Sequence, residues 1–85
     1  MIWYFYVVKC CDNTLYAGVT TDVTRRVREH NTSVRGAKYT RTRRPVELVY
    51  HETYENRSIA QIVESRFKKL TRKQKEKVIK NGYTN

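Results

Sequence analysis

Long apolar runs are missing from this chain of 85 residues. No stretch approaches the roughly 20 apolar residues that a membrane-spanning helix requires. The apolar N-terminal segment has no basic region before it and no small-residue cleavage site after it, so it does not have the composition of a secretory leader. We therefore expect a protein that is not inserted into a membrane and that stays in the cytoplasm.

Cysteine and histidine are nearly absent, and their spacing excludes two kinds of site. Cys10 and Cys11 are adjacent, so a strained vicinal bridge is the only disulfide available within the chain, and we expect both thiols to be reduced. His30 and His51 lie outside any Cys-x-x-Cys or His-x-x-x-His spacing, which argues against zinc. A metal in this protein would be held by carboxylate.

Acidic residues are also scarce, with 8 Asp and Glu against 18 Lys and Arg and a net charge of +10. Such an excess favours a polyanion as partner, because cationic side chains release the counterions condensed on phosphates. A generally basic surface is the alternative that charge alone leaves open. A membrane surface fits less well, since no helix pattern pairs a strong apolar face with a basic one.

The chain is too short for more than one modest core, because a chain of this size buries only about 60% of the surface that it exposes when unfolded. We expect a single domain over residues 1–82 and a short C-terminal tail over residues 83–85, with no repeat and no linker.

The first half of the chain predicts a hairpin followed by a helix. Residues 2–10 are aromatic and β-branched, Asp12-Asn13-Thr14 supplies turn chemistry, and a second strand follows at residues 15–19. Thr21 or Asp22 can then cap a short helix that runs to about His30.

The second half predicts a loop, a strand and two helices. Residues 31–44 are polar and basic and should form a surface loop, and residues 46–50 alternate as a third strand after Pro45. Capping boxes predict the two helix starts, and their residues are Ser58 with Gln61 and Thr71 with Gln74. The first of these helices has an apolar stripe formed by Ile59, Ile62, Val63, Phe67 and Leu70, which should face the core. The second should run to about Lys80, with Gly82 beyond its end.

These elements predict an α+β domain with the order β-β-α-β-α-α. Three antiparallel strands would form a sheet flanked by helices.

The order and spacing of several motifs resemble the GIY-YIG nuclease superfamily. The motifs are Tyr4-Phe5-Tyr6, then Tyr16-Ala17-Gly18, then Arg26, His30 and Glu64, and the resemblance covers residues 2 to 80. Within the superfamily the chain is most similar to the small, single-domain, largely uncharacterised bacterial branch. It departs from the founding motif at Tyr4 and Phe5, where that motif has Gly and Ile, and at Ala17, where it has Ile.

The resemblance implies a site for cutting phosphodiesters. Glu64 would hold a single Mg²⁺ or Mn²⁺ together with waters. Tyr16, and Tyr6 beside it, would hydrogen-bond the attacking water as, or with, the general base. Arg26 would contact the scissile phosphate and His30 would position it or relay a proton.

Each of these residues also has an ordinary structural interpretation. Tyr6 and Tyr16 would then be strand aromatics, Glu64 a solvated ion-pair partner, Arg26 part of the bulk charge, and His30 a cation favoured by the helix dipole. Gly18 would let the backbone turn and approach closely at a strand end. The expected nucleic-acid-binding residues, which a solvated basic surface would also explain, are Arg25, Lys38, Arg41, Arg43 and Arg44.

Three functions follow from this sequence. The first is a metal-dependent endonuclease that acts on DNA rather than RNA and selects branched, flapped or single-stranded structures, since a small domain leaves little room for base readout. The second is a non-catalytic nucleic-acid-binding module. The third is a nuclease subunit whose activity or specificity requires a protein partner.

Overall fold

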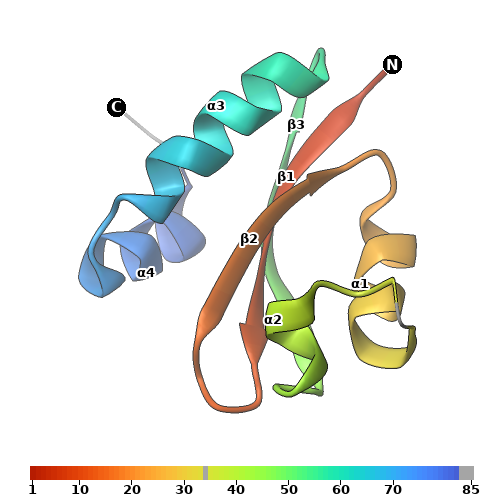
Figure 1. Ribbon diagram of the computed structural model, residues 1–85. Helices are drawn as coiled ribbons and strands as arrows, with labels where there is room; N and C mark the ends of the chain where they lie inside the picture. The colour runs from red at the N-terminus through yellow and green to blue at the C-terminus, as the bar shows by residue number, and fades with distance from the viewer. Residues whose placement is uncertain (34, 83–85) are drawn as a thin grey trace.

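A three-stranded antiparallel sheet forms the centre of the structure, a computed structural model that describes residues 1–33 and 35–82 (Figure 1). The strands are β1 (Trp3–Cys10), β2 (Leu15–Thr20) and β3 (Val46–Tyr54), in the order β2-β1-β3. Because β1 is central and covered on both faces, its apolar residues run without alternation, and Phe5 through Val8 are all buried.

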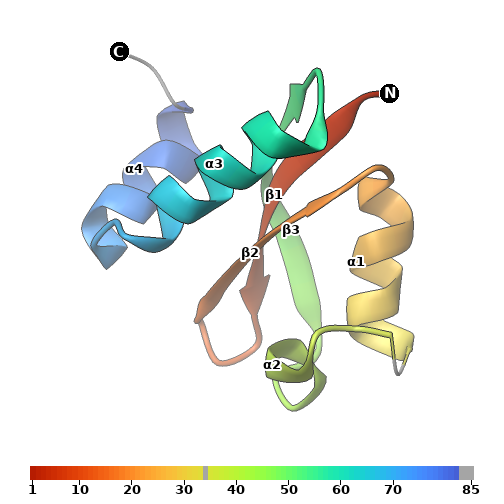
Figure 2. The ribbon, with the colours of Figure 1, turned by 45° about the horizontal axis from the view of Figure 1, so that its top comes forward.

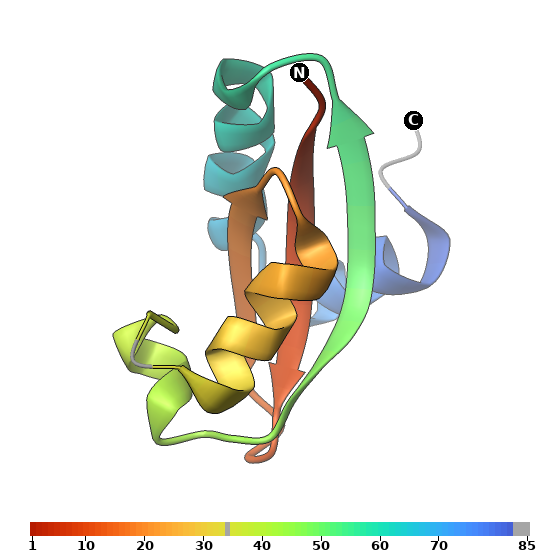
Figure 3. The same cartoon turned by 90° about the vertical axis from the view of Figure 1, so that its right-hand side faces the viewer.

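Helices cover both faces of the sheet. The helices are α1 (Val23–Thr32), α2 (Lys38–Arg41), α3 (Arg57–Lys68) and α4 (Arg72–Asn81). Figure 3 shows α1 in front of the sheet and α3 and α4 behind it. The alternating residues of β1 therefore enter two separate cores, with Phe5 and Val7 packed against Phe67 and with Tyr6 and Val8 packed on the side of α1.

This architecture confirms the predicted α+β fold and the order of its elements, to which α2 adds one short helix. The predicted hairpin is confirmed as well. Asn13 takes a left-handed backbone conformation with φ of 70°, which Asn tolerates better than most residues. The carboxylate of Asp12 accepts hydrogen bonds from the backbone and the hydroxyl of Thr14. No helix in residues 1–33 and 35–82 is long and apolar enough to span a bilayer.

Two of the predicted helix starts are confirmed in detail. Asp22, rather than Thr21, caps α1 by accepting a hydrogen bond from the Arg25 backbone at 3.0 Å. Thr71 and Gln74 form the predicted capping box of α4, and Gly82 ends that helix with φ of 80°. Residues 83–85, where a tail was expected, lie outside the described residues.

The prediction of a surface loop over residues 31–44 was wrong. Helix α1 continues to Thr32, and α2 forms within the basic segment. Thr40 is completely buried in this segment. Its hydroxyl can be buried at low cost, since it is hydrogen-bonded to His30 and to the Ala37 carbonyl. The third strand was also predicted too short, since β3 continues to Tyr54, which pairs with Trp3 at the start of β1.

The start and the buried face of α3 also differ from the prediction. Asn56 caps α3 by accepting from the Ile59 backbone, so the proposed box of Ser58 with Gln61 is not the cap. Three residues of the predicted apolar stripe do face the core, namely Val63, Phe67 and Leu70. Ile59 and Ile62 are instead 39% and 53% exposed, and Ala60 is buried. The small side chain of Ala60 lets the helix approach the sheet along this side, which turns the two isoleucines outward.

The fold predicts unequal effects of two substitutions on α3. Phe67→Ala should lower the free energy of unfolding by about 3–5 kcal/mol, because Phe67 fills the core between α3 and β1. Ile62→Ala on the exposed side should cost less than about 1 kcal/mol. Urea denaturation of both variants would test this, and equal losses would contradict the assigned orientation of α3.

Candidate active site

The site begins with Tyr6, whose buried phenol crosses over the neighbouring strand. Tyr6 in β1 lies opposite Gly18 in β2. A β-carbon at position 18 would lie 2.6 Å from the Tyr6 hydroxyl oxygen, closer than any real contact. Gly18 therefore provides space for the tyrosine, and it lies inside β2 rather than at the end of the strand where a turn was expected.

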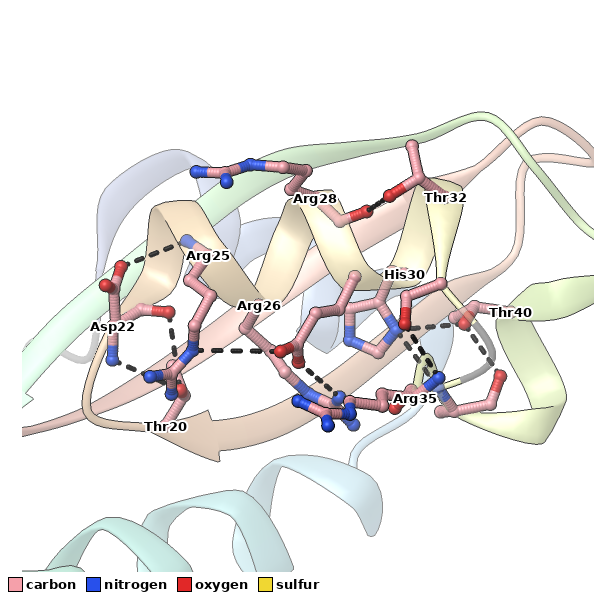
Figure 4. Close-up of polar contacts among 12 residues, drawn as sticks. Thr20, Asp22, Arg25, Arg26, Arg28, His30, Thr32, Arg35 and Thr40 are labelled. Carbon is pink, nitrogen blue, oxygen red and sulfur yellow. Dashed lines mark hydrogen bonds and ion pairs between the residues drawn. The ribbon is translucent and has the colours of Figure 1, made fainter.

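His30 in α1 forms a hydrogen bond with the Tyr6 hydroxyl. The oxygen of Tyr6 lies 2.8 Å from Nε2 of His30. On the other side of the ring, Nδ1 of His30 lies 2.9 Å from the Thr40 hydroxyl, and Figure 4 shows this second contact. The Thr40 hydroxyl donates its proton to the Ala37 carbonyl at 2.9 Å, and the Ala37 backbone N–H donates to Nδ1 of His30 at 3.4 Å. The imidazole is therefore held at both nitrogens, by Tyr6 at Nε2 and by the α2 segment at Nδ1.

The environment keeps both members of this pair neutral at pH 7. Burial, assisted by the charge of Arg26, lowers the pKa of His30 to about 4. Burial also raises the pKa of Tyr6 to about 12, while Arg26 opposes that rise and the charges of Tyr16 and Glu64 add to it. A neutral imidazole has no charge to offer the helix dipole, so the structure does not favour that interpretation of His30.

The same electrostatics show that the predicted residues gather around Tyr6. Arg26 reaches it from α1, Tyr16 from β2 and Glu64 from α3. Because α1 and α3 lie on opposite faces of the sheet, these charges act on Tyr6 from different layers of the fold. With His30, which bonds to Tyr6 directly, all five residues predicted to take part in the chemistry are connected through this tyrosine.

Arg26 is held in place from two sides. Its Nη1 donates to the Glu29 carboxylate at 3.1 Å and to the Arg35 carbonyl at 2.8 Å (Figure 4). These contacts fix the guanidinium beside the Tyr6 hydroxyl, where it also lowers the pKa of His30.

Tyr16 belongs to a stack of rings that the sequence did not predict. Its ring meets His30 edge to face at 5.4 Å and lies nearly parallel to Tyr39 at 5.8 Å. The Arg43 guanidinium covers the other face of Tyr39 at 3.9 Å from the ring centroid. The Tyr16 hydroxyl has no hydrogen-bond partner within the described part of the chain. Tyr39 and Thr40 were both missed, because an aromatic and a threonine within a basic segment look like solvated surface.

Glu64 lies on α3, in the opposite layer from α1, and its charge acts on the Tyr6 phenol. It pairs with Lys68 at 3.3 Å, and its side chain is 21% exposed. The described residues contain no group of three His, Cys, Asp or Glu side chains that could enclose a metal. The donor set therefore does not fit a closed zinc site, but one hard carboxylate fits a Mg²⁺ or Mn²⁺ that keeps most of its waters.

The predicted nucleic-acid-binding residues divide into two groups. Arg25, Lys38 and Arg41 are exposed, although Arg25 lies 3.8 Å from the Glu29 carboxylate. Arg43 and Arg44 are half-buried and already engaged. Arg43 bonds to Asp12 and to the Tyr39 carbonyl. Arg44 donates to the carbonyls of His30 and Ser33 and so satisfies the end of α1.

The neutral burial of His30 predicts a pH-dependent stability. Below its ordinary pKa of 6.5 the unfolded chain binds a proton that folded His30 refuses until about pH 4. The stabilisation is therefore complete above pH 6.5 and is lost as the pH falls toward 4, by about 3 kcal/mol in total. Urea denaturation of the wild type and of His30→Gln across this range would test it. A slope that is unchanged in the variant would contradict the assignment.

Comparison with known proteins places this geometry among bacterial relatives. A UPF0213 protein of Desulfotalea psychrophila is 50% identical over 78 residues, which cover 92% of this chain and 71% of that protein. The UPF0213 protein YazA of Bacillus subtilis is 55% identical over 73 residues, which cover 86% and 73% of the two chains.

Two solved structures are similar to this chain in both fold and sequence. The solution structure of a UPF0213 protein of Bacillus halodurans has a TM-score of 0.62 at 39% identity and covers 98% of this chain and 88% of that one. A solution structure of an E. faecalis protein has a TM-score of 0.64 at 51% identity, with coverages of 94% and 84%. A family profile for the GIY-YIG catalytic domain matches residues 2–77. This chain, with its motif residues gathered around Tyr6, belongs to the GIY-YIG nuclease family.

Proposed function

We propose that the protein is a metal-dependent endonuclease that hydrolyses phosphodiester bonds in DNA and selects its substrate by structure rather than by sequence. The observation that supports this most directly is that four side chains from three elements surround Tyr6. They come from β2, α1 and α3, and they are Tyr16, Arg26, His30 and Glu64.

Tyr16 is the residue suited to contact the attacking water. Burial raises the pKa of Tyr6 to about 12, and its hydroxyl is already hydrogen-bonded to His30, so it is poorly suited to activate a water. The Tyr16 hydroxyl has no such partner among the described residues and can accept or donate to a water. The rings of His30 and Tyr39 fix the plane of its phenol.

Arg26 provides the positive charge beside the scissile phosphate. Its planar fork matches two phosphate oxygens and stabilises the charge that develops there. Contacts with Glu29 and the Arg35 carbonyl hold the guanidinium before substrate arrives, so little reorganisation is required.

Glu64 would hold the divalent ion, Mg²⁺ or Mn²⁺, with waters and substrate oxygens completing the coordination. The bound ion supplies Lewis-acid polarisation of the phosphate and neutralises charge on it. Lys68 pairs with the Glu64 carboxylate at 3.3 Å and would release it when the ion binds.

The central test is cleavage of end-labelled single-stranded, duplex, flap and four-way DNA in Mg²⁺ and in Mn²⁺. We expect cleavage of branched or single-stranded substrates that disappears with EDTA and in Glu64→Gln. Glu76→Gln serves as the matched control, because Glu76 is an exposed glutamate that pairs with Arg72 on α4. Absence of cleavage on every substrate, with binding retained, would instead support the binding module or a subunit that requires a protein partner.

A second test separates the tyrosines within the same assay. Tyr16→Phe keeps the ring stack but removes the hydroxyl that would contact water, and it should lower the cleavage rate about 10²- to 10⁴-fold. Tyr39→Phe removes a hydroxyl from the adjacent ring of the stack and should change the rate little. Equal losses in the two variants would argue against a role for the Tyr16 hydroxyl in the chemistry.

A further inference from the structure

The end of α3 and the whole of α4 carry most of the excess charge of the protein. Residues 66–80 contain eight of the 18 Lys and Arg residues but only one of the 8 acidic residues, Glu76. We call this set the α3–α4 basic surface, and its members are Arg66, Lys68, Lys69, Arg72, Lys73, Lys75, Lys77 and Lys80. None of them was among the expected nucleic-acid-binding residues.

These cations point outward because the apolar side of α4 is already used. Val78 and Ile79 pack against the core cluster that contains Phe67. Lys75 is half-buried and lies over the Phe67 ring, while the other seven cations are exposed. With its apolar residues turned inward, α4 does not have the free apolar face that a membrane-surface helix inserts into lipid.

Little of this charge is neutralised within the protein. In residues 1–33 and 35–82 the surface has two ion pairs, Lys68 with Glu64 and Arg72 with Glu76. The remaining like charges repel one another, and a polyanionic partner would relieve that repulsion.

The spacing of three lysines suits a phosphate backbone. Lys73, Lys77 and Lys80 are separated by four and three residues and therefore lie on one side of α4. At a rise of 1.5 Å per residue they span about 10 Å. Phosphates of one strand advance about 3.4 Å per step along a duplex, so this row covers about three of them.

The surface is continuous with the candidate active site. Lys68 contacts Glu64 itself. Arg72 donates to the Asn13 carbonyl at 2.6 Å, which ties the start of α4 to the β1–β2 turn. Arg43 bonds to Asp12 of the same turn from the other side of the sheet. Figure 2 shows α3 and α4 together on the side of the sheet opposite α1.

We propose that the α3–α4 basic surface binds the phosphate backbone of a DNA duplex that flanks the position cut at the site. This inference rests on the proposed function for the location of the cut, but the binding itself does not require catalysis. The surface would hold the duplex arm of a flap or branch, while the strand to be cut enters beside Tyr16.

The test compares two double variants with the same loss of charge, both in the Glu64→Gln background so that no cleavage occurs. Lys73→Gln with Lys77→Gln removes two cations from the row on α4. Arg28→Gln with Arg57→Gln removes two exposed cations from α1 and from the start of α3. Fluorescence anisotropy with a labelled flap DNA would measure the Kd of each variant at a series of salt concentrations from about 50 to about 200 mM.

We expect the α4 variant to reduce the slope of log K against log salt by about two, because each lost duplex phosphate contact contributes about 0.9. The control should leave the slope nearly unchanged, and thermal denaturation would verify that both variants fold. Equal slopes in the two variants would overturn the proposal, as would polyglutamate competing as well as duplex DNA. If the α4 variant reduces the slope as expected but the wild type cuts no substrate, the binding surface would stand and only the proposed nuclease function would be contradicted.

Discussion

The hydrogen bond between Tyr6 and His30 connects the central strand to α1, and the rest of the site depends on it. Both groups are buried and neutral, so the pair contributes polarity without a buried charge. Thr40 fixes the other nitrogen of the imidazole and thereby draws α2 against α1. The ring of His30 then packs edge to face with the ring of Tyr16. A buried hydrogen bond in the core thus fixes the position of the Tyr16 side chain at the site.

The position of the site at an outer strand explains how so small a domain can assemble it. Strand β2 is an outer strand of the sheet formed by the described residues, with β1 as its neighbour, so helices on both faces can approach its edge. Arg26 lies on α1 and Glu64 on α3, so opposite charges act on the same phenol from two layers of the fold. Each helix also contributes a buried face to one of the two cores, so its catalytic and structural residues lie on adjacent sides.

Much of this arrangement could be predicted from the sequence, and the failures have definite causes. The hairpin, α1 and the box at Thr71 carry strong local signals, and the order of the motifs predicts that Glu64 faces the tyrosines. The burial of Thr40 could not be predicted, since its partner is ten residues away and its neighbours are basic. The orientation of α3 was predicted only in part, because its apolar stripe is wide, and the close approach at Ala60 leaves one side of that stripe exposed.

The packing of Tyr6 against Gly18 also limits how the sequence can change at these two positions. The space above the glycine is filled by the phenol, so the volume allowed at one position is set by the other. In evolutionary terms the two positions form an epistatic pair, because a larger residue at position 18 is tolerated only after position 6 has shrunk. Shrinking position 6 first removes the hydroxyl on which His30 depends. Both single-step routes pass through an impaired protein, so the pair can be exchanged only together, and a designer who transfers one must transfer the other.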